Sequence, residues 1–154
     1  MARAILGVIV GYVAMAALVF ITFTLAYLAM GADGAFKPGT YDVTALWLAV
    51  SFALSVVGAL LGGFVCAAVA KGPKAPVALV GIVFVLGLVF AVATVMAPED
   101  PTPKVRQGDV GNLEAMQGAK QPVWVAFLNP LIGTAGVLAG VRLKRRGGGS
   151  PTQE

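Results

Sequence analysis

Four uninterrupted apolar runs dominate this sequence, and none of them contains a charged side chain. A run of at least about 18 apolar residues without charges is typical of a helix that crosses a lipid bilayer. We therefore expect an all-α integral membrane protein, built as a four-transmembrane-helix bundle. The four runs are Ile5 to Met30, Val43 to Ala70, Ala75 to Pro98 and Gln121 to Val141.

The rest of the sequence consists of short connections and leaves no room for a separate soluble domain. The chain has 154 residues, of which 58% are hydrophobic, so residues 1–146 are expected to form one transmembrane domain. The Gly-rich segment 147–154 is expected to be a flexible tail without a functional role. The expected helices are at about 4–30, 43–70, 75–97 and 121–142, with outer loops at 31–42 and 98–120 and an inner turn at 71–74.

The distribution of basic residues gives the expected orientation, because Lys and Arg accumulate on the cytoplasmic side of membrane proteins. With four spans, both termini and the turn at 71–74 lie on one side, where basic residues outnumber acidic ones. We therefore expect both termini in the cytoplasm, and the richness in Ala, Gly and Val favours a bacterial inner membrane. The basic residues on the expected cytoplasmic side are Arg3, Lys71, Lys74, Arg142, Lys144, Arg145 and Arg146.

Small residues recur at helical spacing in every run, so each expected helix has a face on which another backbone can approach closely. In a bilayer, close packing of this kind holds helices together, since apolar surface alone does not. We expect these faces to pack the chain's own bundle; a contact between two copies through Gly7 and Gly11, or through Gly136 and Gly140, is the alternative. The expected helix-packing residues are Gly7, Gly11, Ser55, Gly58, Gly62, Gly133, Gly136 and Gly140.

The dipeptide Asn129-Pro130 is the most unusual feature within a span. Proline cannot donate a hydrogen bond to the carbonyl of Ala126 and bends a helix, while Asn129 brings a polar amide to the same level. We interpret the pair as a kink that is stabilised by a hydrogen bond from the amide to a neighbouring helix. The alternative is that the pair forms a polar binding point.

The loop at 98–120 is the largest segment between the spans. Asn112 is placed to cap a short helix, which would bring Leu113 and Met116 to one face. Such a helix is expected to lie on the membrane surface or on a partner, where it would contribute specificity. The alternative is a solvated connector with a single helical turn.

The residue types inside the spans exclude most membrane chemistry. The chain has no histidine and one cysteine, Cys66, and all its acidic residues lie outside the apolar runs. Haem and metal sites need His or Cys ligands, and proton-coupled transport needs an embedded acid. We therefore expect no catalytic residue, no metal and no cofactor, and the protein is not expected to be an enzyme.

Two classes of function remain. The first is a non-catalytic accessory or structural subunit of a larger bacterial membrane assembly, beside a membrane-protein partner or a second copy of the chain. The alternative is a small homo-oligomeric channel or carrier for an uncharged or lipid-like solute, with Asn129, Ser51, Ser55 and Thr134 as polar lining. The lipid bilayer is an expected partner in both classes, and a nucleic acid is not. The residues expected to contact lipids of the inner leaflet are Arg142, Lys144, Arg145 and Arg146.

Overall fold

The computed structural model describes residues 2–70, 72–97 and 105–147, and every named element within them is a helix. Residues 98–104 of the second expected loop, and residues 148–154 of the expected tail, lie outside the described part. The helices are α1 (Ala2–Ala35), α2 (Ala45–Ala70), α3 (Lys74–Met96), α4 (Asn112–Gly118) and α5 (Val123–Gly147).

Four of the described helices, α1, α2, α3 and α5, are long and apolar enough to cross a membrane. The prediction of an all-α protein with four apolar helices of spanning length is therefore confirmed, and the chain is a multi-pass membrane protein. The physical basis is that lipid offers no hydrogen-bond partners, so a backbone that crosses it must satisfy its own polar groups within a helix.

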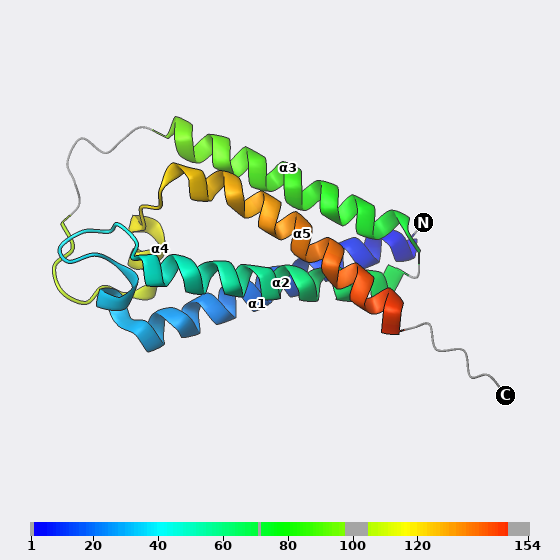
Figure 1. Cartoon of the computed structure of the whole chain (residues 1–154), viewed down its shortest axis with the longest axis horizontal. Coiled ribbons are helices and arrows are strands. Elements are labelled where there is room, and N and C mark those ends of the chain that lie inside the picture. Colours follow the sequence, from blue (N-terminus) through cyan, green and yellow to red (C-terminus); the bar gives the residue numbers. More distant parts are fainter. Residues whose placement is uncertain (1, 71, 98–104, 148–154) are drawn as a thin grey trace.

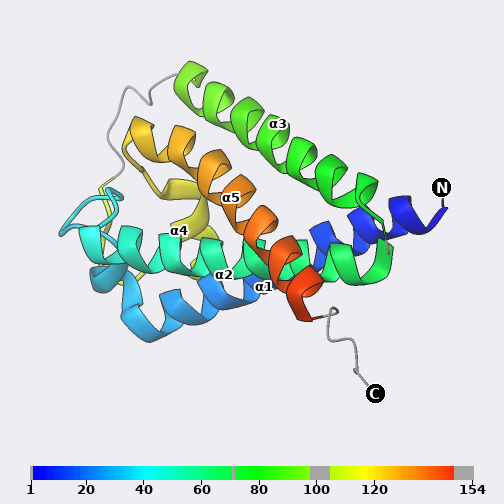
Figure 2. The same cartoon turned by 45° about the vertical axis from the view of Figure 1, so that its right-hand side comes forward.

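The long helices form a crossed bundle. In both views α5 begins beside α3 and crosses α2 toward its own C-terminal end, with α4 at the end opposite the termini (Figure 1, Figure 2). α2 packs against α1 and α5, whereas α3 packs mainly along α5 and less extensively against α1 and α2. No contact joins α1 to α5 within the described residues. α2 therefore provides the main link between α1 and α5.

Adjacent glycines let α2 pack closely on two sides. Gly62 lies against α1, where a Cβ atom would be 2.8 Å from that of Met15. Gly63 lies against α5, where a Cβ atom would collide with the backbone carbonyl of Val137. Consecutive residues of a helix are about 100° apart, so the two glycines serve different neighbours. A buried cluster surrounds this contact and consists of Ala59, Cys66, Ala75, Leu79, Val137 and Val141.

The end of the bundle opposite the termini is built from the connections at 31–44 and 105–122, and we call it the loop end. α1 is interrupted at Gly31, whose φ of 67° and ψ of 176° are accessible almost only to glycine. The N–H of Val43 donates to the carbonyl of Lys120 at 3.1 Å, and the N–H of Lys120 donates to the carbonyl of Tyr41 at 2.9 Å. The loop end has a buried cluster of its own, made of Tyr27, Ala32, Ala35, Phe36, Tyr41, Val43, Trp47 and Ala115.

Candidate functional site

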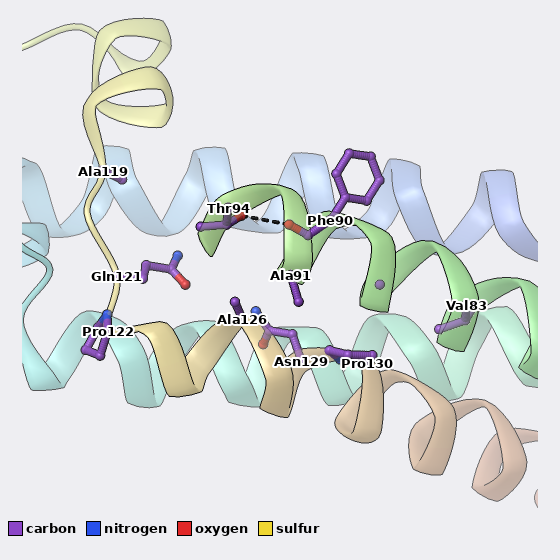
Figure 3. A pocket seen from close by; sticks show the side chains of 11 residues that line it. Val83, Phe90, Ala91, Thr94, Ala119, Gln121, Pro122, Ala126, Asn129 and Pro130 are labelled. Carbon is purple, nitrogen blue, oxygen red and sulfur yellow. Dashed lines mark hydrogen bonds between the residues drawn. The ribbon is translucent and has the colours of Figure 1, made fainter. Parts of the chain in front are cut away.

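A cavity of about 410 Å³ lies between α3 and α5 near the loop end, and we call it the α3–α5 cavity (Figure 3). Its α3 wall contains the small residues Gly87 and Ala91. Its α5 wall carries Asn129 and Pro130, and the connection from α4 adds Gln121. The volume is within the range of small-molecule sites, about 300–1,000 Å³. The dipeptide singled out in the sequence therefore lies on the wall of a cavity.

The polar side chains of this cavity are two carboxamides and one hydroxyl. Figure 3 shows the carboxamides of Gln121 and Asn129 pointing into the space between α3 and α5. The hydroxyl of Thr94 is already engaged, because it donates to the carbonyl of Phe90 at 2.8 Å. No ionisable side chain is among the described residues that line the cavity. The site therefore offers neutral donors and acceptors in apolar surroundings, which suits an uncharged ligand.

Asn129 makes no hydrogen bond to the other residues drawn in Figure 3, where the bond from Thr94 to Phe90 is the only one. The expected amide bond to a neighbouring helix is therefore absent from this group of residues. The reason is the composition of the facing part of α3, since Gly87 and Ala91 have no polar side chain. The carboxamide of Asn129 is exposed.

Pro130 holds α5 close to α3. The residue is buried, and a Cβ atom on Gly87 would lie 2.7 Å from the Cβ atom of Pro130. α5 continues as one helix through this position. Because proline has no N–H, the carbonyl of Ala126 lacks its usual donor four residues later, and Ala126 lines the same cavity.

A second cavity, of about 400 Å³, lies between α1 and α4, and we call it the α1–α4 cavity. Its lining is rich in aromatic side chains, among them Phe23 and Trp47, whose rings meet edge to face with centroids 6.0 Å apart. Ala119 and Gln121 line both cavities, so the connection between α4 and α5 separates the two spaces.

Long-range hydrogen bonds hold α4 and the segment before it against α1. The hydroxyl of Tyr27 donates to the carbonyl of Val110 at 2.7 Å, and the amide of Asn112 donates to the hydroxyl of Thr24 at 3.2 Å. The prediction that Asn112 caps this helix is wrong. Gly111 holds the cap position without a side-chain bond, and Asn112 is the first helical residue. The amide of Asn112 instead donates across the gap to α1.

A third bond ties α4 to the first connection. Tyr41 donates its hydroxyl to the carboxylate of Glu114 at 2.6 Å. This hydrogen bond raises the pKa of Tyr41, and burial of the ring raises it further, since both favour the neutral phenol over the phenolate. Leu113 and Met116, which we expected on one face of the helix, are exposed, while Ala115 between them is buried.

Arg106 is a residue whose structural role the sequence analysis missed. It is buried at the loop end, where its guanidinium pairs with Asp33 and also donates to the carbonyl of Gly108 at 2.6 Å. In the sequence it is one basic residue of a polar loop, and its partner lies 73 positions away. No local pattern marks such a pair.

The glycines expected to pack helices lie at three interfaces. Four of them lie between α1 and α2, and two glycines of α5 face α2. Gly133 faces α3, where a Cβ atom built on it would lie 3.0 Å from the side chain of Val83. Ser55 is half-buried. The contact of Gly63 with Val137 was missed, although two consecutive glycines are a signal that a helix has two close neighbours. The glycines at the α1–α2 interface are Gly7, Gly11, Gly58 and Gly62, and those facing α2 are Gly136 and Gly140.

The other polar residues proposed for a solute path do not gather with Asn129. Ser51 is buried and Thr134 is half-buried, and neither hydroxyl has a hydrogen-bond partner among the described residues. Neither residue, nor Ser55, lines the α3–α5 or the α1–α4 cavity.

The basic residues proposed for lipid contact occupy the last turns of α5. Arg142, Arg145 and Arg146 are exposed. The ammonium group of Lys144 lies 5.9 Å from the ring centroid of Phe64, within the range of a cation–π contact. They belong to the C-terminal end of α5, which lies at the end of the bundle opposite α4 (Figure 1).

Comparison with family models, with curated protein sequences and with solved structures finds no match for this chain. Its class therefore rests on its own architecture, which is that of a multi-pass membrane protein with four apolar helices of spanning length. Within the described part of the chain, two cavities lie near the loop end, and neither has a charged lining residue.

Proposed function

We propose that this protein is a small, non-catalytic channel or carrier for an uncharged or lipid-like solute. The observation that supports this proposal is the α3–α5 cavity, in which the carboxamides of Gln121 and Asn129 face an otherwise apolar space. The sequence analysis ranked this class second, behind an accessory subunit. The cavity moves it to first place because it supplies a specific site.

The solute class follows from the chemistry of the lining. The carboxamides of Gln121 and Asn129 can replace hydrogen bonds that a neutral solute loses when it leaves water. A charged solute would need a counter-charge, because an unpaired ion at membrane depth costs several kcal/mol, about 2.5–3.5 on insertion scales. The described lining contains no such group.

The test is solute entry into liposomes that contain the purified protein. Glycerol and urea serve as neutral solutes in a swelling assay, and a fluorescent phosphatidylcholine serves as the lipid-like probe in a transbilayer exchange assay. We expect faster entry or exchange of at least one probe than in empty liposomes, and we expect Asn129→Leu to abolish the increase. Gln117→Leu is the matched control, since Gln117 is an exposed amide that lines neither cavity.

Two results would overturn the proposal. The first is that none of the three probes crosses faster than in empty liposomes. The second is that Asn129→Leu transports as well as the wild type, which would show that the cavity is not on the path.

The second candidate is an accessory subunit of a larger membrane assembly, and the packing of α3 favours it. α3 buries only Ala75, Pro76, Leu79 and Ala91 among its described residues. Gly81 has no atom within 4 Å of a built Cβ, so the outward face of α3 has space for the close approach of another helix. Native mass spectrometry of the protein from its own membrane tests this candidate: a second polypeptide in the complex supports it, whereas a single chain or a homo-oligomer counts against it.

We also propose an orientation in which both termini lie in the cytoplasm, with the protein in the bacterial inner membrane. The start of α1 and the end of α5 are at the same end of the bundle (Figure 1). Arg142, Lys144 and Arg145 lie at this end, and basic residues favour the cytoplasmic side. The loop end then faces outward, and the close contacts of the glycines support a bundle that is tightly packed through small-residue faces.

A further inference from the structure

The α1–α4 cavity has a composition different from that of the α3–α5 cavity. The cavity has a volume of about 400 Å³ and is bounded by the second half of α1, by Trp47 of α2 and by α4. Aromatic side chains, among them Phe20, Phe23 and Trp47, form a large part of its lining, and no carboxylate or basic side chain is among its described lining residues. An aromatic wall of this kind binds apolar groups through contact area and not through charge.

The polar groups around this cavity are largely paired. The hydroxyl of Tyr27 donates to Val110, and the hydroxyl of Thr24 accepts from Asn112. Gln121 is the remaining amide, and it lies where the cavity borders the connection to α5. The interior therefore suits an apolar chain, and the edge can receive one neutral polar group.

The position of the exposed lining residues indicates the side from which a ligand enters. Phe20 is 58% exposed on a helix that has the length and composition of a membrane span, so its ring is available to surrounding lipid. Met116, on α4, is 57% exposed and lines the same cavity. Trp47, by contrast, is 9% exposed and forms part of the inner wall. The cavity thus extends from a lipid-facing mouth to a buried indole.

We propose that the α1–α4 cavity holds one acyl chain of a membrane lipid, with α4 as its cover. The bilayer supplies this ligand at high local concentration, directly at the mouth between Phe20 and Met116. Among the described helices α4 packs against α1, and the bonds from Asn112 to Thr24 and from Tyr41 to Glu114 hold it in place. This site is separate from the α3–α5 cavity and does not depend on transport.

The test uses the buried indole as a contact probe. Trp124→Phe first removes the other tryptophan, which is exposed and packs against Phe52, so that only Trp47 fluoresces. The protein is then placed in bilayers of phosphatidylcholine with brominated acyl chains, because bromine quenches tryptophan on close contact. We expect strong quenching, since a chain inside the cavity reaches Trp47 and chains in the surrounding bilayer do not.

Substitutions at the mouth give matched controls. Ala16 is exposed and lines the cavity, so Ala16→Phe fills it and is expected to abolish most of the quenching. Ala17 is equally exposed but does not line the cavity, so Ala17→Phe is expected to leave the quenching unchanged. Phe20→Ala widens the mouth and should increase the quenching.

Two outcomes overturn the proposal: no quenching of Trp47 in the parent protein, or equal quenching in the parent and the Ala16→Phe variant. If Ala16→Phe misfolds, Phe20→Ala decides instead, since quenching no stronger than in the parent protein overturns the proposal. Neither result bears on solute flux through the α3–α5 cavity.

Discussion

Pro130 of α5 packs directly on Gly87 of α3, so closely that a Cβ atom on the glycine would lie 2.7 Å from the Cβ atom of the proline. The proline ring is rigid and buried, and it cannot move aside as a long side chain would. This contact sets the distance between the two helices that enclose the α3–α5 cavity. Substitution at Gly87 therefore tests both the stability and the shape of the site.

We expect Gly87→Ala to destabilise the bundle by about 1–3 kcal/mol, the usual cost of forcing an extra methyl group into a packed contact. Gly81→Ala is the matched control, since a Cβ atom there meets nothing within 4 Å and alanine favours a helix by about 0.5–1 kcal/mol over glycine. Thermal unfolding in detergent, followed by circular dichroism, measures both variants. Equal unfolding temperatures for the two would contradict the proposed role of this contact.

The bond from Tyr41 to Glu114 predicts a loss of stability in alkali. The hydrogen bond to Glu114, with burial, raises the pKa of Tyr41 in the folded state above the ordinary value of about 10. The stability that it contributes is therefore fully present below about pH 10 and is lost as the pH rises through the higher folded pKa. We expect Tyr41→Phe to be less stable than the wild type at pH 8, and the difference to shrink above pH 10. A difference that is constant across this range would exclude the linkage.

Tyr27→Phe should loosen the loop end without disturbing the spans. The variant loses the 2.7 Å bond to the carbonyl of Val110, at a cost of about 0.5–1.5 kcal/mol. We expect faster amide exchange in residues 105–118, measured by hydrogen exchange and mass spectrometry, and unchanged exchange in α2. Tyr12→Phe, in the opposite half of the same helix, is the control and should leave residues 105–118 as they are.

The proposed orientation predicts which positions a membrane-impermeant maleimide can reach in intact cells. Cys66 is fully buried and should not react, so single cysteines can be introduced into the natural sequence. Gln107→Cys, at the exposed loop end, should be labelled from outside, and Arg145→Cys should be labelled only after the membrane is permeabilised. The reverse pattern would place the termini outside.

The spans could be predicted because their signal is local: each is a run of apolar residues whose length alone matches a bilayer. The loop end could not, because its bonds join distant residues. Tyr27 and Val110 are 83 positions apart, and neither differs in sequence from an ordinary interfacial tyrosine or loop valine. Asn112 is a second example: its local sequence favours a helix cap, but its amide donates to Thr24 of α1, which is distant in the sequence.

One wall of the α3–α5 cavity could be predicted from the sequence, and the rest could not. Asn129-Pro130 stands out because an amide and a proline are rare together in an apolar run. Gln121 does not, since it reads as the polar boundary of the span, and only the fold brings its carboxamide to the same cavity. Whether Asn129 finds a hydrogen-bond partner on α3 depends on which side chains of α3 face it. The rotation of α3 about its axis decides this, and the sequence does not give that rotation.

Within the described residues α2 packs against both α1 and α5, which do not contact each other, and this has a consequence for biogenesis. The α1–α2 hairpin can complete its own interface while the later helices are still being synthesised, and it presents Gly63 as a ready docking site for Val137. Two separately expressed halves, divided in the connection before α3, would then reassociate through the face of α2 that is turned toward α5. We therefore expect the N-terminal hairpin, if it is inserted first, to act as the template on which the C-terminal pair of helices assembles.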